Sequence, residues 1–190
     1  MAHNSFLHLF KMDVARWIRP EEIASLQEVS WPVTLKLLWR HMPLRAVAWF
    51  RFASWAKQSG IPGVPGAVQR RILRHYGLEL SSGAAIGGGL YIAHPVGTTV
   101  AIEQMGENVS IIANVTLGMR GERRWPRIGD RTFIGAGARV LGNIDVGADA
   151  VIGANAVVLN DVPAGATVVG IPAKIVRQRP VAEDVAQTDA

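Results

Sequence analysis

His94 and an arginine-rich segment are the parts of this sequence best suited to chemistry. His94 lies in the run Gly89-Leu-Tyr-Ile-Ala-His-Pro95, and residues 118–127 hold four arginines among ten residues. A neutral imidazole can take the proton of a hydroxyl group as that group attacks an electrophile. Guanidinium groups bind phosphates and carboxylates through paired hydrogen bonds. The two features favour general-base catalysis and anion binding, with a structural histidine and a solvated surface loop as the alternatives.

Other kinds of site are disfavoured by composition. The chain has no cysteine, which excludes a disulfide framework, a thiolate metal site and a cysteine nucleophile. Its histidines are scattered without the paired spacing of a metal site, so we expect no bound metal. They are His3, His8, His41, His75 and His94.

Nothing in the sequence predicts a membrane-spanning helix or a signal peptide. The longest uncharged run, between Glu79 and Glu103, is rich in glycine, serine and threonine rather than in leucine and isoleucine. Charged residues interrupt the apolar positions near the N-terminus, namely Lys11, Asp13 and Arg16. The expected location is the cytoplasm.

Charge divides the chain into two regions. Residues 1–80 contain 11 Lys+Arg and 5 Asp+Glu, a net charge of +6, whereas residues 81–190 contain 9 and 10, a net charge of −1, and together these give the +5 of the whole chain. Five of the six tryptophans also lie in the first region. This change in composition predicts two structural units that meet near residue 80.

The first unit has the pattern of helices. One helix is expected to begin after Pro20 and another at Ser30, which could cap it. Residues 44–57 alternate aromatic and basic positions up to a stop at Gly60, and residues 67–76 predict a last basic helix.

Three functions compete for this basic, tryptophan-containing unit. The favoured one is structural, with the aromatic residues in a core and an oligomer contact and the arginines in solvent. The second is peripheral contact with an anionic membrane, at its inner face. Nucleic-acid binding is the least favoured, because no nucleic-acid motif accompanies the charge, and we expect none.

The second unit has a six-residue period. An aliphatic side chain recurs at that step through most of residues 86–158, often followed by glycine, and the longest unbroken run is Ile128, Ile134, Val140, Val146, Ile152 and Val158. Six is the period of neither a helix nor a simple strand, and it predicts short strands joined by corners. Stacked coils would align the aliphatic residues in columns, about 4.8 Å apart.

Two interruptions of this period mark candidate functional segments. The spacing is irregular between Ile92 and Met105, where His94 lies. Between Leu117 and Ile128 the step is 11 residues, so the arginine-rich segment must leave the coil as a loop.

Residues 78–178 resemble the hexapeptide-repeat acyltransferases, and in particular their serine acetyltransferase-like branch. The matching stretches are Gly89-Leu-Tyr-Ile-Ala-His-Pro95, Val109–Gly118, Ile134–Asn143, Ile152–Val158 and Asp161–Lys174. The resemblance implies a left-handed parallel β-helix over residues 79–176. A small α-helical unit over residues 1–78 would precede it, and a flexible tail over residues 177–190 would follow.

The resemblance also implies an activity. Members of the family use acetyl-CoA and form homotrimers with active sites between chains, and the N-terminal helices could pair two trimers. The family's catalytic histidine corresponds to His94, and backbone N–H groups near Gly118 would stabilise the oxyanion. The positions that correspond to the coenzyme A site are Gly118, Ala136, Ala154, Lys174 and Arg177.

Two departures from serine acetyltransferases concern the acceptor. Ala93 replaces the aspartate that precedes the catalytic histidine, and Trp125 replaces a second histidine beside the retained Arg124. We expect Arg124 and Trp125 to contact the acceptor. The departures favour the polysaccharide-biosynthesis branch and a saccharide hydroxyl as acceptor. Serine O-acetylation in cysteine biosynthesis is the alternative, and a non-catalytic solenoid scaffold is a further one.

Overall fold

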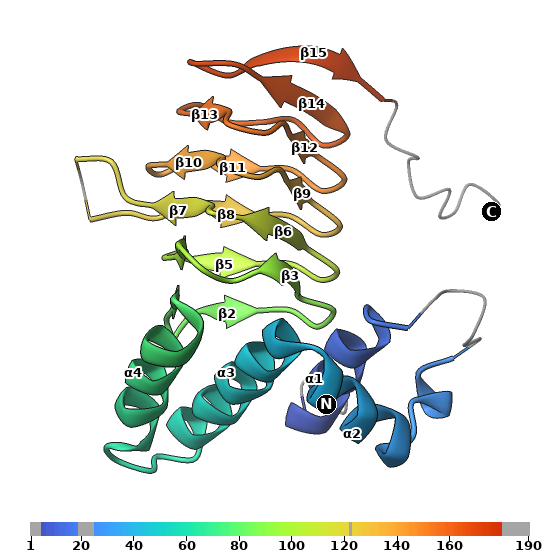
Figure 1. The fold of residues 1–190 in the computed structure, drawn as a ribbon. Helices are drawn as coiled ribbons and strands as arrows, with labels where there is room; N and C mark the ends of the chain where they lie inside the picture. The colour runs from blue at the N-terminus through green and yellow to red at the C-terminus, as the bar shows by residue number, and fades with distance from the viewer. Residues whose placement is uncertain (1–4, 19–24, 122, 180–190) are drawn as a thin grey trace, which may run out of the picture.

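The computed structural model describes residues 5–18, 25–121 and 123–179, and it consists of a helical unit followed by a parallel β-solenoid (Figure 1). The helical segments are α1 (Phe6–Ala15), the 3₁₀ segment η2 (Leu26–Glu28), α2 (Trp31–Arg40), α3 (Met42–Gln58) and α4 (Val64–Tyr76). The strands are β1 (Leu78–Leu80), β2 (Ala85–Ile86), β3 (Tyr91–His94), β4 (Thr98–Val100), β5 (Gln104–Met105), β6 (Ser110–Ala113), β7 (Thr116–Gly118), β8 (Arg127–Ile128), β9 (Phe133–Ile134), β10 (Arg139–Leu141), β11 (Asp145–Val146), β12 (Val151–Ile152), β13 (Val157–Val158), β14 (Ala166–Val169) and β15 (Lys174–Gln178).

Three sheets form the walls of the solenoid. Their strand orders are β1-β4-β7-β10-β13, β11-β8-β5-β2 and β15-β14-β12-β9-β6-β3. Up to β13, each strand pairs with the strand three places away along the chain, and in the last coil β12 pairs with β14 and β14 with β15. All these pairings are parallel except β14 with β15, which is antiparallel and covers the last coil. The architecture is the expected left-handed parallel β-helix, with about five coils.

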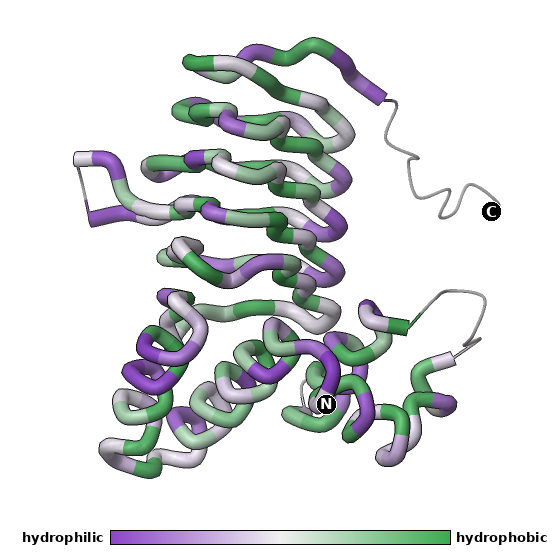
Figure 2. Tube along the Cα trace, viewed as in Figure 1, coloured by the Kyte–Doolittle hydropathy of each residue, from purple (hydrophilic) through white to green (hydrophobic). Residues whose placement is uncertain are grey.

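The six-residue period corresponds to three columns of buried side chains, one for each sheet. Equivalent residues are paired between neighbouring coils, as in Ile92 with Ile111 and Ile111 with Ile134. The column behind the third sheet consists of Ile92, Ile111, Ile134, Ile152 and Val168. Apolar residues repeat from coil to coil in Figure 2, and the sequence prediction of a stacked core is confirmed.

The helices close the first coil of the solenoid. An end coil has unpaired backbone groups, which need partners when they are buried. The buried guanidinium of Arg51 in α3 donates to the carbonyl oxygens of Ile86 and Gly87, and the buried carboxylate of Asp13 in α1 accepts from the N–H of Leu90. Arg51 and Asp13 also pair with each other, with Nε and Oδ2 2.7 Å apart. In addition to these polar contacts, one hydrophobic cluster runs from α3 and α4 into the coils.

Several local predictions need adjustment. Helix α2 starts directly after Ser30, but that side chain makes no capping hydrogen bond. Helix α3 extends beyond residues 44–57 at both ends, α4 begins three residues before Ala67, and α1 was not expected. The helix start predicted at Pro20 lies outside the described residues.

The unit boundaries at residues 78 and 176 stay predictions. Strand β15 continues through Arg177 to Gln178, because β14 offers it a hydrogen-bonding edge, so the segment expected as a tail begins inside a strand. The rest of that tail, residues 180–190, is not among the described residues.

Candidate active site

His94 lies on an exposed corner of the first coil. The step from Ile92 to Val100, its counterpart in the next sheet, is eight residues instead of six, and the two extra residues form a turn. In this turn the N–H of Thr98 donates to the carbonyl oxygen of Pro95 at 3.0 Å, and the Thr98 hydroxyl donates to the carbonyl oxygen of His94 at 3.4 Å. The insertion thus holds the imidazole outside the wall of the coil, where a second molecule can reach it.

The end of helix α4 supports this turn. Gly77 caps α4 with φ of 61°, and its carbonyl oxygen accepts a hydrogen bond from Gly97 N–H at 3.0 Å. A β-carbon on Gly77 would lie 3.3 Å from the Cα of Val96. The close approach requires glycine, and it fixes the height of the turn above the helical unit. The sequence does not predict this contact, although a glycine directly after a basic helix is a signal for it.

Small residues continue upward from His94 along the same corner of the solenoid. His94 is the register partner of Ala113 in the next coil, and the pairing of the following coils places Ala136 and Ala154 at the same corner position. Backbone bonds of 2.8 Å confirm the alignment, since Gly137 N–H donates to Ala113 and Asn155 N–H donates to Ala136. A slender ligand chain could lie in van der Waals contact with this column, which we name the alanine column.

Lys174 lies at the far end of the alanine column, whereas Arg177 does not. Strand β15 pairs Lys174 with Val169, next to Gly170, and Gly170 is the residue that follows Ala154 in the column. Arg177 pairs with Thr167, further along the strand. Both cations are exposed and could meet phosphate groups, but Lys174 is the one that lies beside the column position of Gly170.

Gly118 and the arginine-rich loop lie at a different corner. Strands β4 and β7 run side by side in the first sheet, with Thr99 beside Thr116 and Val100 beside Leu117. His94 precedes this sheet and Gly118 ends it, so the width of the sheet separates them. Figure 1 shows the loop after β7 projecting sideways from the solenoid. Within one chain, therefore, Gly118, Arg124 and Trp125 do not come together with His94.

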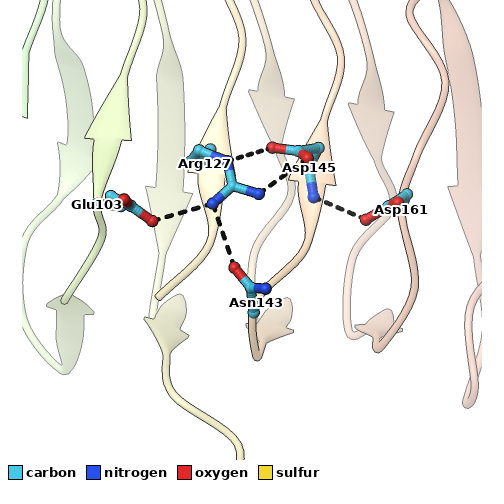
Figure 3. Close-up of polar contacts among 5 residues, drawn as sticks. All are labelled: Glu103, Arg127, Asn143, Asp145 and Asp161. Atoms are coloured by element: carbon cyan, nitrogen blue, oxygen red, sulfur yellow. Dashed lines mark hydrogen bonds and ion pairs between the residues drawn. The ribbon is translucent and has the colours of Figure 1, made fainter. Parts of the chain in front are cut away.

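The guanidinium of Arg127 is hydrogen-bonded to side chains of the neighbouring coils. It donates to Asp145 Oδ2 at 2.9 Å, to Glu103 Oε2 at 3.0 Å and to Asn143 Oδ1 at 3.2 Å, and Asp145 N–H donates in turn to Asp161 (Figure 3). These hydrogen bonds raise the pKa of Arg127 and lower that of Asp145. Arg127 is thus paired with carboxylates of the neighbouring coils, so it is not the arginine of this segment that best suits an anionic ligand.

The other predicted acceptor residues are on the loop surface. Arg124 is exposed and Trp125 is half-buried, and Ala93 is half-buried beside His94. Among the described residues, no group of three or more His, Asp or Glu side chains could hold a metal ion. No helix in the described part of the chain is long and apolar enough to cross a membrane.

Comparison with known proteins gives one family. The family model described as "Bacterial transferase hexapeptide (six repeats)" matches residues 126–160. Serine acetyltransferase of Mycobacterium tuberculosis is 40% identical over 153 residues, which are 77% of this chain and 66% of that protein. Serine acetyltransferase of Staphylococcus xylosus is 50% identical over 106 residues, 54% of this chain and 49% of that protein.

Solved structures show the same relationship. Soybean serine acetyltransferase, as the apoenzyme, superposes with a TM-score of 0.77 at 33% identity, covering 90% of this chain and 69% of that one. Serine acetyltransferase of Neisseria gonorrhoeae gives a TM-score of 0.77 at 32% identity, with 93% and 68% covered.

These relatives change the weight of the acceptor predictions. The chain spans about half to two thirds of the length of the two curated relatives. All the relatives quoted are named serine acetyltransferases, so the preference for the polysaccharide-biosynthesis branch lacks support from them, and the serine alternative gains it. The chain belongs to the hexapeptide-repeat acyltransferase family, and the quoted relatives are named serine acetyltransferases.

Proposed function

We propose that this protein is an O-acetyltransferase that uses acetyl-CoA as donor and the hydroxyl group of L-serine as acceptor. The observation that supports it most is the alignment of the exposed His94 with the alanine column. The pantetheine arm of acetyl-CoA is long and slender and has the reactive thioester at its end. If this arm lay along the alanine column, the thioester would be next to the imidazole of His94. The names of the relatives support serine as acceptor, and one solved neighbour is a serine acetyltransferase in complex with CoA.

In the proposed reaction, the pantetheine arm lies along Ala113, Ala136 and Ala154, and Lys174 meets the phosphates. The serine hydroxyl oxygen attacks the thioester carbon while His94 takes the hydroxyl proton. The carbon–sulfur bond then breaks, and the imidazolium returns that proton to the leaving thiolate. The products are O-acetylserine and CoA. The transfer is direct, because the chain has no cysteine to carry the acetyl group.

The proposed enzyme is a homotrimer in which neighbouring chains complete each site. Gly118, Arg124 and Trp125 lie across a sheet from His94 of the same chain, so they can act on His94 only in another copy. In that assembly, Gly118 N–H could stabilise the oxyanion and Arg124 could meet the serine carboxylate.

A saccharide hydroxyl is the second candidate acceptor, and Ala93 and Trp125 favour it. In serine acetyltransferases, to judge from the resemblance, an aspartate at the position of Ala93 meets the amino acid. An alanine methyl group cannot pair with the serine ammonium group. An indole ring at Trp125 offers a sugar an apolar face and one N–H donor.

The acceptor can be identified by measuring CoA thiol release from acetyl-CoA with L-serine, with L-alanine and with a panel of sugars. L-alanine is the matched control, since it has the same ammonium and carboxylate groups but no hydroxyl. Release with L-serine above the L-alanine rate supports the proposal. Release with a sugar alone would replace serine by a saccharide, and release with none of them would favour the scaffold alternative.

A further inference from the structure

We infer that the outer face of α2 docks the protein on an anionic membrane surface. Val33 of this short helix is exposed at 38% on another side, and the three most exposed large apolar side chains of the helix are Trp31 at 58%, Leu35 at 63% and Trp39 at 84%. They follow each other at intervals of four residues, so they lie on one side of the helix. This side, which we name the tryptophan stripe, has no partner among the described residues that would explain its apolar character.

The remaining faces of α2 have clear roles. At 100° per residue, Thr34 and Leu37 point away from the tryptophan stripe, whereas Leu38 borders it beside Trp31. These three are the buried or half-buried residues of the helix. Leu37 and Leu38 pack against the small cluster that contains Phe10 and Leu44. The inner face thus anchors α2 to the helical unit, and the stripe is left over for another contact.

The charges beside the tryptophan stripe are positive. Lys36 lies next to it on the exposed side of α2, Arg40 lies further round the helix beside Lys36, and Arg45 is exposed at the start of α3. Residues 1–80 as a whole have a net charge of +6. Apolar and aromatic residues on one side with lysine and arginine beside them are typical of helices that lie in the interface of an anionic bilayer. Such a helix lies on the membrane without crossing it.

A second copy of the chain fits the tryptophan stripe less well. The three side chains together expose on the order of 500 Å², whereas a stable protein interface buries about 800 Å² on each partner. Two copies meeting through this face would also bring two positively charged units together. A membrane has neither restriction, because it is flat, continuous and of opposite charge.

The position of α2 is compatible with docking. Figure 1 shows it in the helical unit, at the end of the molecule opposite β15. In the proposed trimer, three copies of the stripe would be present, and simultaneous binding would raise the overall affinity. This inference does not depend on the acceptor or on the activity.

Vesicle flotation tests the inference with the full chain. Wild-type protein should float with vesicles that contain phosphatidylglycerol but not with vesicles of phosphatidylcholine alone, and salt should weaken the binding. Trp31→Ser/Leu35→Ser/Trp39→Ser should remain at the bottom of the gradient. Ile175→Ser/Val176→Ser is the matched control, because these side chains are also exposed and apolar but lie in β15 at the other end, and it should float like wild type.

Each other outcome overturns the inference. These are wild type that does not float, wild type that floats equally with uncharged vesicles, and a triple variant that floats like wild type. A triple variant with a lower mass in light scattering would assign the stripe to a second copy. If the triple variant does not fold, Lys36→Gln/Arg40→Gln decides, because it keeps the stripe. It should weaken binding roughly 30-fold, and unchanged binding would contradict docking.

Discussion

Gly97 donates its backbone N–H to the carbonyl oxygen of Gly77 across 3.0 Å, and this bond joins the turn that holds His94 to the end of helix α4. The residue between His94 and Gly97 that touches the helix cap is Val96, whose Cα lies close to the position of a β-carbon on Gly77. The helical unit therefore determines where the candidate catalytic imidazole lies.

Replacing Gly77 should impair both stability and activity. Gly77→Ala places a β-carbon at φ of 61° and 3.3 Å from the Cα of Val96, so the turn must move. We expect a stability loss of about 1–2 kcal/mol and a several-fold lower kcat. Gly60→Ala is the control, since Gly60 has φ of 70° but nothing within 4 Å of its β-carbon. It should lose similar stability and keep its kcat, and equal kinetic losses in both variants would contradict a positioning role for Gly77.

A larger side chain in the alanine column should obstruct the donor. Ala154 is exposed at the corner, so Ala154→Leu should fold normally while its isobutyl group occupies the track of the pantetheine arm. We expect KM for acetyl-CoA to rise at least tenfold, with a smaller change for the acceptor. Ala85→Leu is the control at an exposed position beside a cavity of about 590 Å³ near the helices, and its KM should not change. An unaltered KM in Ala154→Leu would place the arm elsewhere.

The buried pair of Asp13 and Arg51 should be important for stability. Asp13→Asn removes the charge that neutralises a buried guanidinium, and breaking a buried pair in this way costs about 3–5 kcal/mol. Asp149→Asn is the comparison, because Asp149 pairs with Arg131 through two hydrogen bonds of 2.7 Å at the surface. That exposed pair should contribute less than about 1 kcal/mol. Urea unfolding measures both, and similar losses would mean that Asp13 does not brace the first coil.

Acid should weaken the ion pair between Arg127 and Asp145 on the second sheet. The guanidinium of Arg127 lowers the pKa of Asp145 below its ordinary value of 3.8. A carboxylate with a lowered pKa in the folded state stabilises the fold above the unfolded-state pKa, and this contribution is lost as the pH falls through the folded-state pKa. Arg127→Gln should therefore reduce the difference in melting temperature between pH 7 and pH 3. If the variant and wild type show the same difference in melting temperature, the ion pair between Arg127 and Asp145 contributes nothing to the pH dependence of stability.

The sequence predicted the solenoid because its information is local and repeated. Successive coils contribute Ile111, Ile134 and Ile152 to one column, so a six-residue period specifies the stacking directly. The two interruptions of that period also coincide with the exposed corner of His94 and with the projecting loop. In a regular repeat, each insertion changes the spacing between successive aliphatic residues and can therefore be seen in the sequence.

The sequence did not predict contacts between distant segments. Helix α1 is apolar over most of its length, so its sequence does not single out one buried face, and it is held by the pairing of Asp13 with Arg51, 38 residues away. In the sequence Arg127 cannot be told apart from the other loop arginines, whereas in the structure Asp145 and Glu103 lie beside it. The separation of Gly118 from His94 follows from which edge of the sheet each residue occupies, and spacing along the chain does not give that.

Removal of the imidazole is the most direct test of the account. His94→Ala should lower kcat for CoA release with the preferred acceptor by about 10²–10⁴-fold, with little effect on KM for acetyl-CoA or on the melting temperature. His75→Ala, at an exposed histidine in the last turn of α4, should behave like wild type. A His94→Ala enzyme that turns over at the wild-type rate would contradict the assignment of His94 as the base.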